Sequence, residues 1–271
     1  EDIKQMVKAR AQEFEPGKWI RGANFNDSKL AEKRHITRWE LDEVAPDNPV
    51  FLRADTGHQA VVNSKALDLA NVSKETPDPS GGEIQRDESG EPTGLLYEMA
   101  MGLVALIIPP YTVEELKTGY IEVLNQFSQW GVTSTHDASG DELGIRAFHQ
   151  LLNEGKRQVR VSLMVLLFPR TQDEVNIGDA LKNIGIESGF GNDWLKVMTL
   201  KIFADGSGAG GTAAVYEPQN RGPKGLGLMM TDPSIIEPAV IQAHAAGLRC
   251  SIHSIGDRGI DVALDCYEKA Q

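Results

Sequence analysis

The second half of the chain alternates between two patterns of apolar and polar positions. Stretches with apolar residues three or four apart, as on one face of a helix, are followed by short runs of β-branched and apolar residues. From Tyr111 onward the helical pattern predicts helices over residues 113–130, 141–154, 172–184, 232–246 and 257–270. The runs between them predict strands over residues 132–136, 159–168, 195–203 and 248–253. Such alternation is typical of βα units around a parallel sheet.

Residues at the ends of the predicted helices support this pattern. Thr112 is an N-cap candidate for the first helix, and Asp232, followed by proline, opens the fourth. Glycines that can close a helix follow three of them: Gly131, Gly155 and Gly247.

The first 110 residues do not show this alternation of helices and strands. A helix is predicted near Asp2 to Phe14, and short strands such as Val50 to Ala54 are separated by turns rich in Gly, Pro and Asp. We interpret residues 1–110 as a cap or insertion over the mouth of a barrel and residues 111–271 as the barrel part.

Four βα units are half of what a closed (β/α)8 TIM-type barrel requires, and half a barrel exposes two unpaired sheet edges. The predicted fold class is therefore α/β, a partial barrel of about four βα units with a cap-like insertion. Two explanations stay open. The chain is truncated at both ends, or a partner chain, as in a homo-oligomer, or a further segment closes the barrel. The end at Gln271, directly after a helix, favours truncation.

Composition narrows the class of protein. The 27 Lys and Arg against 39 Asp and Glu give a formal charge of −12, and no basic patch is present, which argues against nucleic acid or an anionic membrane as partner. No apolar run is long enough to span a bilayer. Cys250 and Cys266 form no C-x-x-C pair, so we expect reduced core thiols. A cytoplasmic enzyme with a small-molecule substrate fits, although the chain opens on Glu1 and an upstream signal could be missing.

Polar residues end three of the four predicted strands, where the catalytic groups of parallel βα proteins gather. These strand ends are Thr135-His136-Asp137, Lys201 through Ser207, and His253 through Asp257. His136 and Asp137 are neighbours on a strand, so their side chains face opposite sides and are not expected to act as one unit.

Lys201 and Asp205 share one face of the predicted strand 195–203 and its extension, because strand side chains alternate with a period of two. A buried lysine there must be paired with Asp205, neutralised by a lowered pKa, or chemically altered. The alternative is that Lys201 faces solvent or makes an ordinary ion pair.

His253 ends an apolar strand ahead of a glycine turn, a position that suits an imidazole metal ligand. The alternative for His253, as for His136, is a histidine with satisfied hydrogen bonds and no metal.

The segment from Gly206 to Gly211 matches G-x-G-x-x-G after a strand, a pattern associated with dinucleotide binding. No long helix is predicted to follow it, since Pro218 arrives early, and a pyrophosphate would lack a helix N-terminus. We interpret the match as a coincidence and the segment as a mobile active-site loop.

Six segments, in this order, resemble the amidohydrolase superfamily, in particular the subgroup of N-substituted formamide deformylases and related metal-dependent hydrolases (amidohydrolase family 3). They are Leu41-Asp42 with Asn48-Pro49-Val50, Gly57-His58 with Asn63 to Leu67, Pro79 to Gly82 with Gly94-Leu95-Leu96, Gly131 to Ser134, Lys201 to Ser207, and His253 to Asp257.

The resemblance implies a barrel whose metal ions are held by a His-x-His pair on the first strand, a lysine on the fourth, histidines on the fifth and sixth, and an aspartate on the eighth. Lys201 matches the lysine and His253 the fifth-strand histidine, so both are expected as catalytic metal ligands. The lysine is often carboxylated in such proteins, and one or two divalent transition metal ions, zinc in the first place, are implied. His58, Asp205 and His136 are expected on the substrate side.

The sequence also departs from this pattern. It contains no His-x-His, and the sixth-strand histidine and eighth-strand aspartate, the usual general base, would lie beyond Gln271. We therefore expect this chain alone to be inactive, with a metal site that can be empty. For a longer parent protein the expected reaction is hydrolysis of a C–N bond in an amide or formamide through a metal-activated water.

Two rival hypotheses stay open. Lys201 could form a Schiff base in a barrel lyase or aldolase, or the chain could be a non-catalytic domain for binding or assembly. The substrate, the metal, the carboxylation of Lys201 and the oligomeric state are not readable from the sequence.

Overall fold

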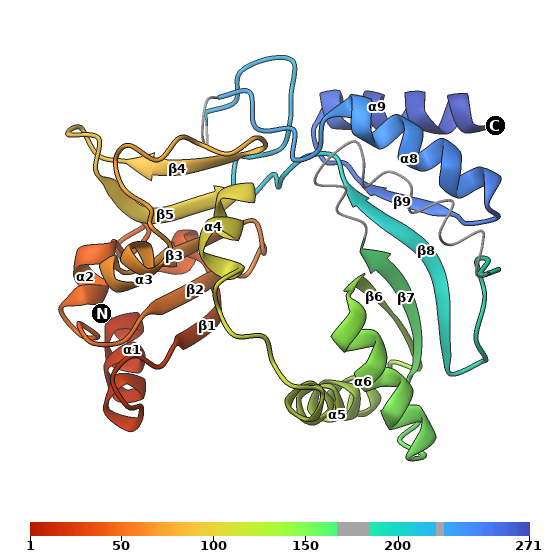
Figure 1. Cartoon of the computed structure of the whole chain (residues 1–271), viewed down its shortest axis with the longest axis horizontal. Coiled ribbons are helices and arrows are strands. Elements are labelled where there is room, and N and C mark those ends of the chain that lie inside the picture. The colour runs from red at the N-terminus through yellow and green to blue at the C-terminus, as the bar shows by residue number, and fades with distance from the viewer. Residues whose placement is uncertain (167–184, 221–224) are drawn as a thin grey trace. The chain divides into compact units, whose positions relative to one another are not determined.

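The computed structural model describes residues 1–166, 185–220 and 225–271 (Figure 1). The helix predicted over 172–184 and the end of the strand predicted over 159–168 lie outside the described residues. The chain divides into two compact units. Unit 1 comprises Glu1–Pro109, Asp205–Met230 and Ile255–Gly259, and unit 2 comprises Pro110–Ala204, Thr231–Ser254 and Ile260–Gln271.

Unit 1 is built on a mixed sheet with the strand order β1-β2-β3-β5-β4. Its strands are β1 (Ile20–Phe25), β2 (Val50–Ala54), β3 (Gln59–Val62), β4 (Gly82–Arg86) and β5 (Pro92–Glu98). The β1–β2 pair is parallel and the other pairs are antiparallel. Its helices are α1 (Asp2–Glu13), α2 (Arg38–Asp42), α3 (Ser64–Leu69), α4 (Gly102–Ala105) and the 3-10 turns η1 (Asp27–Lys29) and η2 (Met99–Met101). The predicted helix near residues 2–14 and strand 50–54 are present.

Both faces of the unit 1 sheet are buried. Val61 and Leu95 belong to a core cluster with residues of α1 and α2, whereas their chain neighbours Val62 and Leu96 belong to a cluster with residues of α3 and α4. Alternating side chains that are apolar on both faces explain why β3 is buried along its whole length.

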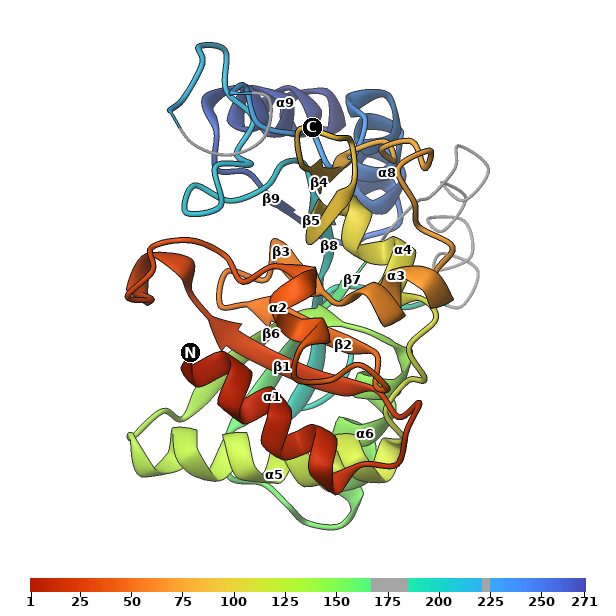
Figure 2. The same ribbon diagram turned by 90° about the vertical axis from the view of Figure 1, so that its left-hand side faces the viewer.

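Unit 2 holds a parallel sheet with the order β6-β7-β8-β9 (Figures 1 and 2). Its strands are β6 (Ser134–Gly140), β7 (Arg160–Leu166), β8 (Leu195–Phe203) and β9 (Cys250–His253). The helices are α5 (Val113–Gln129), α6 (Glu142–Asn153), α8 (Pro233–Ala245) and α9 (Asp257–Ala270), of which α9 begins in unit 1. The predicted βα pattern and parallel sheet are confirmed; within the described residues the sheet does not close into a barrel.

Two strands start two residues later than predicted. β6 begins at Ser134 rather than residue 132, and β9 begins at Cys250 rather than residue 248. In both cases the first predicted strand residue donates its amide hydrogen to the preceding helix, Val132 to the Phe127 carbonyl and Leu248 to the Ala243 carbonyl. These bonds close the helices, so the strands start later.

The two faces of the unit 2 sheet differ. Val161 and Leu163 of β7 pack with Leu124 of α5 and Phe148 of α6, so these helices cover one face. The residues between them in sequence point to the opposite face, which we call the open face. From the strand register, the open face carries His136 and Ser162, Met164 and Thr199, Leu166 and Lys201, Lys201 and Ser251, and Phe203 and His253 as neighbouring pairs.

Two further properties bear on earlier expectations. No helix among the described residues is both long and apolar enough to cross a membrane. Cys250 and Cys266 are free thiols, and burial raises the pKa of Cys250 to about 11, which keeps it protonated and unreactive at neutral pH.

Candidate functional site

Lys201 lies near the end of β8 on the open face, with 8% of its surface exposed. Its ammonium nitrogen lies 4.5 Å from the centroid of the Phe203 ring, a cation–π contact. Among the described residues, Lys201 makes no ion pair or hydrogen bond through this nitrogen. Burial lowers the pKa of Lys201, because the charged form loses its hydration. Of the predicted options, a neutralised or altered lysine fits these facts better than a solvent-facing one.

His253 ends the neighbouring strand β9 and lies beside the same aromatic ring. The ring centroids of His253 and Phe203 are 5.2 Å apart at an angle of 47°, and the two residues are paired in the β8–β9 register. Two residues before Lys201 and His253, the hydroxyls of Thr199 and Ser251 form a 2.9 Å hydrogen bond between the two strands. The fold therefore places the two predicted metal ligands, Lys201 and His253, in contact with the same Phe203 ring.

These residues fit part of a metal site. An imidazole and a lysine that is neutral or carboxylated are donors that divalent transition metals accept. The residue after His253, Ser254, has a buried hydroxyl oxygen with no hydrogen-bond partner among the described residues. Within the described part of the chain, no three His, Cys, Asp or Glu side chains gather closely enough to hold an ion. The donor set is therefore compatible with a metal, but the described residues supply only part of it.

His136 lies on β6, also on the open face, opposite Ser162 of β7. Its neighbour Asp137 points to the helix-covered face, where Asp137 and Asp141 add to burial in raising the pKa of Tyr120 to about 12. The two side chains thus face opposite ways, as the strand period predicts. β7 separates β6 from β8, so His136 and Lys201 are not neighbours in the sheet.

Asp205 belongs to unit 1 and has no exposed surface. One carboxylate oxygen accepts the amide hydrogen of Ile255 at 3.0 Å, and the other accepts those of Ala214 at 3.0 Å and Gly256 at 2.8 Å. These bonds join the segments around Ala214 and Ile255, both within unit 1. A direct contact of Asp205 with substrate stays a prediction.

His58 precedes β3 in unit 1 and retains 9% of its surface exposed. Its Nδ1 lies 2.8 Å from Oε2 of Glu98, and the Thr212 hydroxyl donates to the other carboxylate oxygen, Oε1. Thr212 Oγ1 in turn accepts the Ser207 amide hydrogen at 2.8 Å. We call this set the Thr212–Glu98–His58 chain. The sequence did not single out Glu98 or Thr212, because they lie 114 positions apart and neither carries a local pattern.

The glycine-rich segment after β8 is a loop of unit 1, and no helix opens at Gly211. A Cβ at Gly206 would overlap Thr212 Oγ1 and Glu98 Oε1. Close packing therefore explains this glycine, and the dinucleotide interpretation is not needed. Mobility of the loop stays a prediction.

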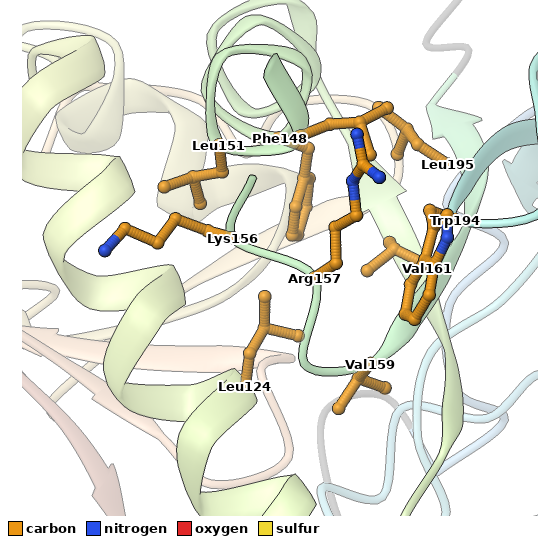
Figure 3. A pocket seen from close by; sticks show the side chains of 10 residues that line it. Leu124, Phe148, Leu151, Lys156, Arg157, Val159, Val161, Trp194 and Leu195 are labelled. Carbon is orange, nitrogen blue, oxygen red and sulfur yellow. The ribbon is translucent and has the colours of Figure 1, made fainter. Parts of the chain in front are cut away.

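A small cavity of about 20 Å³ lies elsewhere in unit 2 (Figure 3). It is lined by the starts of β7 and β8 with residues of α5 and α6, and Lys156 and Arg157 come from the α6–β7 loop. Its volume is that of about one water molecule. Because it lies at the opposite strand ends from Lys201 and His253, it is a packing gap and not part of the candidate site.

Known proteins of similar sequence cover the chain from end to end. The N-substituted formamide deformylase of Arthrobacter pascens is 30% identical over 99% of this chain and 49% of its own length. The protein LONG AFTER FAR-RED 3 of Arabidopsis thaliana is 32% identical over 97% of this chain and 46% of its own length. The chain thus spans about half the length of the curated relatives it matches.

A solved structure shares the fold. The crystal structure of an uncharacterized metal-dependent hydrolase from Pyrococcus horikoshii OT3 matches with a TM-score of 0.66 and 29% identity, over 98% of this chain and 50% of that chain. The family comparison matches the amidohydrolase family over residues 1–271, which confirms the resemblance inferred from the sequence. This chain belongs to the amidohydrolase family.

Proposed function

We propose that the chain is part of a metal-dependent hydrolase that cleaves a C–N bond of an amide or formamide. The observation that carries the proposal is the joint placement of Lys201 and His253 around Phe203 at the carboxyl ends of two adjacent parallel strands. The deformylase relative and the metal-dependent hydrolase of similar fold support the same chemistry.

The residues divide the work as follows. Lys201, buried and with a lowered pKa, is prone to lose its proton. As a neutral amine it can add to CO2, release a proton to solvent and become a carbamate with two oxygen donors. His253 presents an imidazole nitrogen, and the Phe203 ring contacts both groups. A divalent ion, zinc in the first place, would when bound activate water and polarise the substrate carbonyl.

The remaining predicted roles belong to the same proposal. His58, Asp205 and His136 are assigned to the substrate side, residues 1–110 to a cap, and residues 111–271 to part of a (β/α)8 barrel. One or two metal ions and a substrate of small size are expected.

One rival is favoured by a specific observation. A lysine with a lowered pKa and no hydrogen bond or ion pair among the described residues is also what a Schiff-base enzyme requires. Borohydride added with a small carbonyl compound would then fix an adduct on Lys201, whereas the hydrolase proposal expects none.

Metal content tests the proposal directly. Elemental analysis would compare this chain, and a protein extended to the length of its relatives, with their Lys201→Ala variants. Lys196→Ala, on the same strand, is the matched control. We expect about one or two equivalents of transition metal in the extended protein, lost with Lys201→Ala and kept with Lys196→Ala. An extended protein that stays metal-free after metal is added back would reject the hydrolase and favour the Schiff-base or non-catalytic alternatives.

A further inference from the structure

Unit 1 buries the carboxylate of Glu98, whose side-chain partners among the described residues are His58 and Thr212. The Glu98 side chain has 0% of its surface exposed and that of His58 11%. Glu98 Oε2 contacts His58 Nδ1 at 2.8 Å, and Oε1 accepts the Thr212 hydroxyl. Burial of a carboxylate costs free energy unless its oxygens are bonded, so this arrangement is held together by its hydrogen bonds.

The backbone at Glu98 is strained to reach this position. Its φ of 48° and ψ of −121° fall in a region that residues with a Cβ rarely adopt. The Glu98 amide also donates to the His58 carbonyl at 3.1 Å, so main chain and side chain join the same two residues. A glycine would occupy this conformation without penalty. That a glutamate stands here indicates that the carboxylate itself is needed.

The loop that follows β8 contacts Glu98 through the side chain of Thr212. Thr212 accepts the Ser207 amide hydrogen and donates its own hydroxyl hydrogen to Glu98, which fixes the direction of that hydroxyl. The absence of a side chain at Gly206 makes room for both groups. The loop that follows β8 is thereby connected to the ring of His58.

We propose that Thr212 and Glu98 are positioning residues that hold the His58 ring in a single tautomer, with the proton on Nδ1. A carboxylate that accepts from Nδ1 leaves Nε2 of the neutral ring as a hydrogen-bond acceptor. Nε2 of His58 then meets the substrate. This last step rests on the proposed function, whereas the tautomer itself does not.

Nitrogen NMR of the imidazole ring tests the proposal without any substrate. Long-range proton–nitrogen spectra of the labelled chain report which ring nitrogen carries hydrogen, and His58→Gln assigns the His58 signals. We expect the Nδ1-protonated form in the unchanged protein. Glu98→Gly removes the carboxylate while relieving the backbone strain, and should shift His58 to a mixture of tautomers or to the Nε2-protonated form.

Hydroxyl variants give matched comparisons. Thr212→Val should weaken the tautomer preference and Thr212→Ser should restore it. Thr93→Val removes a hydroxyl from the same strand as Glu98, one bonded to Gln85 instead, and should change nothing at His58. Thermal unfolding of each variant confirms that it is folded.

Three results would overturn the proposal: a mixture of tautomers in the unchanged protein, a doubly protonated His58 at neutral pH, or a His58 spectrum unaltered in folded Glu98→Gly. A second test measures activity: the extended protein is assayed for the release of amine from simple N-substituted formamides. We expect kcat/KM to fall about tenfold or more in Glu98→Gly and Thr212→Val. If no formamide or amide is cleaved at all, the proposed function fails, while the tautomer result still decides the role of Glu98.

Discussion

Lys201 is the residue where burial and charge conflict most clearly. Its side chain is almost covered, and its ammonium nitrogen contacts the Phe203 ring. A cation–π contact returns only about 1–2 kcal/mol, less than the hydration that a fully buried cation loses. The lysine is therefore retained at a cost in stability, which is expected of a functional group rather than a structural one.

Replacement of Lys201 by methionine should stabilise the metal-free protein. At pH 7, with chelator present, we expect Lys201→Met to raise the free energy of unfolding by about 1 kcal/mol, because the burial penalty of the cation disappears. Burial lowers the folded-state pKa of Lys201 below its ordinary value, so the unfolded chain binds more protons between the two pKa values. The stability of the unchanged protein should rise with pH in that window and approach that of the variant.

Urea unfolding at several pH values measures both effects. Lys196→Met on the same strand is the control. A Lys201→Met protein that is less stable at pH 7 would mean that the lysine is paired or chemically altered even without metal.

At Gly206 the lack of space for a side chain explains why the residue is glycine. A methyl group there would overlap Thr212 Oγ1 and Glu98 Oε1. Gly206→Ala should therefore lower the free energy of unfolding by about 2 kcal/mol. Gly208→Ala, in the same loop, would meet its nearest atom at an ordinary 3.6 Å and should be tolerated. Equal effects of the two changes in urea unfolding would count against close packing as the reason for Gly206.

The sequence predicts some of these residues and not others. Lys201 and His253 are found because a strand end is visible from periodicity and polar groups at strand ends are few. Glu98 and Thr212 are not found, because what defines them is a contact across 114 residues and a backbone angle, and neither leaves a local pattern. The same contact explains Gly206, which sequence alone could only match to a phosphate motif.

Helix ends are the elements that the sequence predicts best, because their determinants are local. α5 begins after Thr112 with a complete capping box, and α8 after Asp232, as predicted. Three helices close in one way, with a glycine at positive φ whose following residue donates back into the helix: Val132 to Phe127, Lys156 to Leu151, and Leu248 to Ala243. The sequence predicts the glycines, but it does not predict that Val132 and Leu248 belong to this closure rather than to the strand that follows.

The cap of α5 gives a prediction at the scale of one element. Thr112 Oγ1 accepts the Glu115 amide hydrogen at 3.2 Å, and the Glu115 carboxylate accepts the Thr112 amide hydrogen at 2.8 Å. Thr112→Ala should lower the free energy of unfolding by about 1 kcal/mol. Thr118→Ala, exposed in the middle of the same helix, should be neutral or slightly stabilising, since alanine favours helix. Chemical denaturation followed by circular dichroism compares them; an equal loss in both would show that the cap is not what matters.

At the scale of the whole molecule, the division of the chain into two units is hard to predict from sequence. The sequence suggested one boundary near residue 110, whereas unit 1 also takes in Asp205–Met230 and Ile255–Gly259. Two side chains provide a physical reason. The Asp205 carboxylate binds the amides of Ala214, Ile255 and Gly256 and so joins these two segments to each other. The Thr212 hydroxyl, which donates to Glu98, joins the first of them to residues Glu1–Pro109. Hydrogen bonds from one side chain to distant main chain leave no periodicity, so a reading by local pattern assigns these segments to the strands they follow.

Asp205 and its hydrogen-bond partners lie in unit 1, although neighbouring residues in the sequence lie in unit 2. We therefore expect Asp205→Asn to destabilise unit 1 and to leave unit 2 unchanged. An amide accepts through one oxygen only and turns an N–H toward the donors, so charge-assisted bonds worth about 1.5–3 kcal/mol each are weakened. We expect hydrogen exchange at the Ala214, Ile255 and Gly256 amides to accelerate about tenfold or more. The Leu200 amide, bonded to the Arg249 carbonyl in unit 2, should keep its rate although β9 ends two residues before Ile255.

Asp232→Asn is the matched control for this exchange experiment, because asparagine caps a helix about as well as aspartate. It should leave all four rates unchanged. Equal acceleration of Leu200 and Ile255 in Asp205→Asn would mean that the two units open together, and that the carboxylate stabilises the molecule as a whole. Acceleration confined to the three amides would show that Asp205 holds the segments Asp205–Met230 and Ile255–Gly259 together within unit 1.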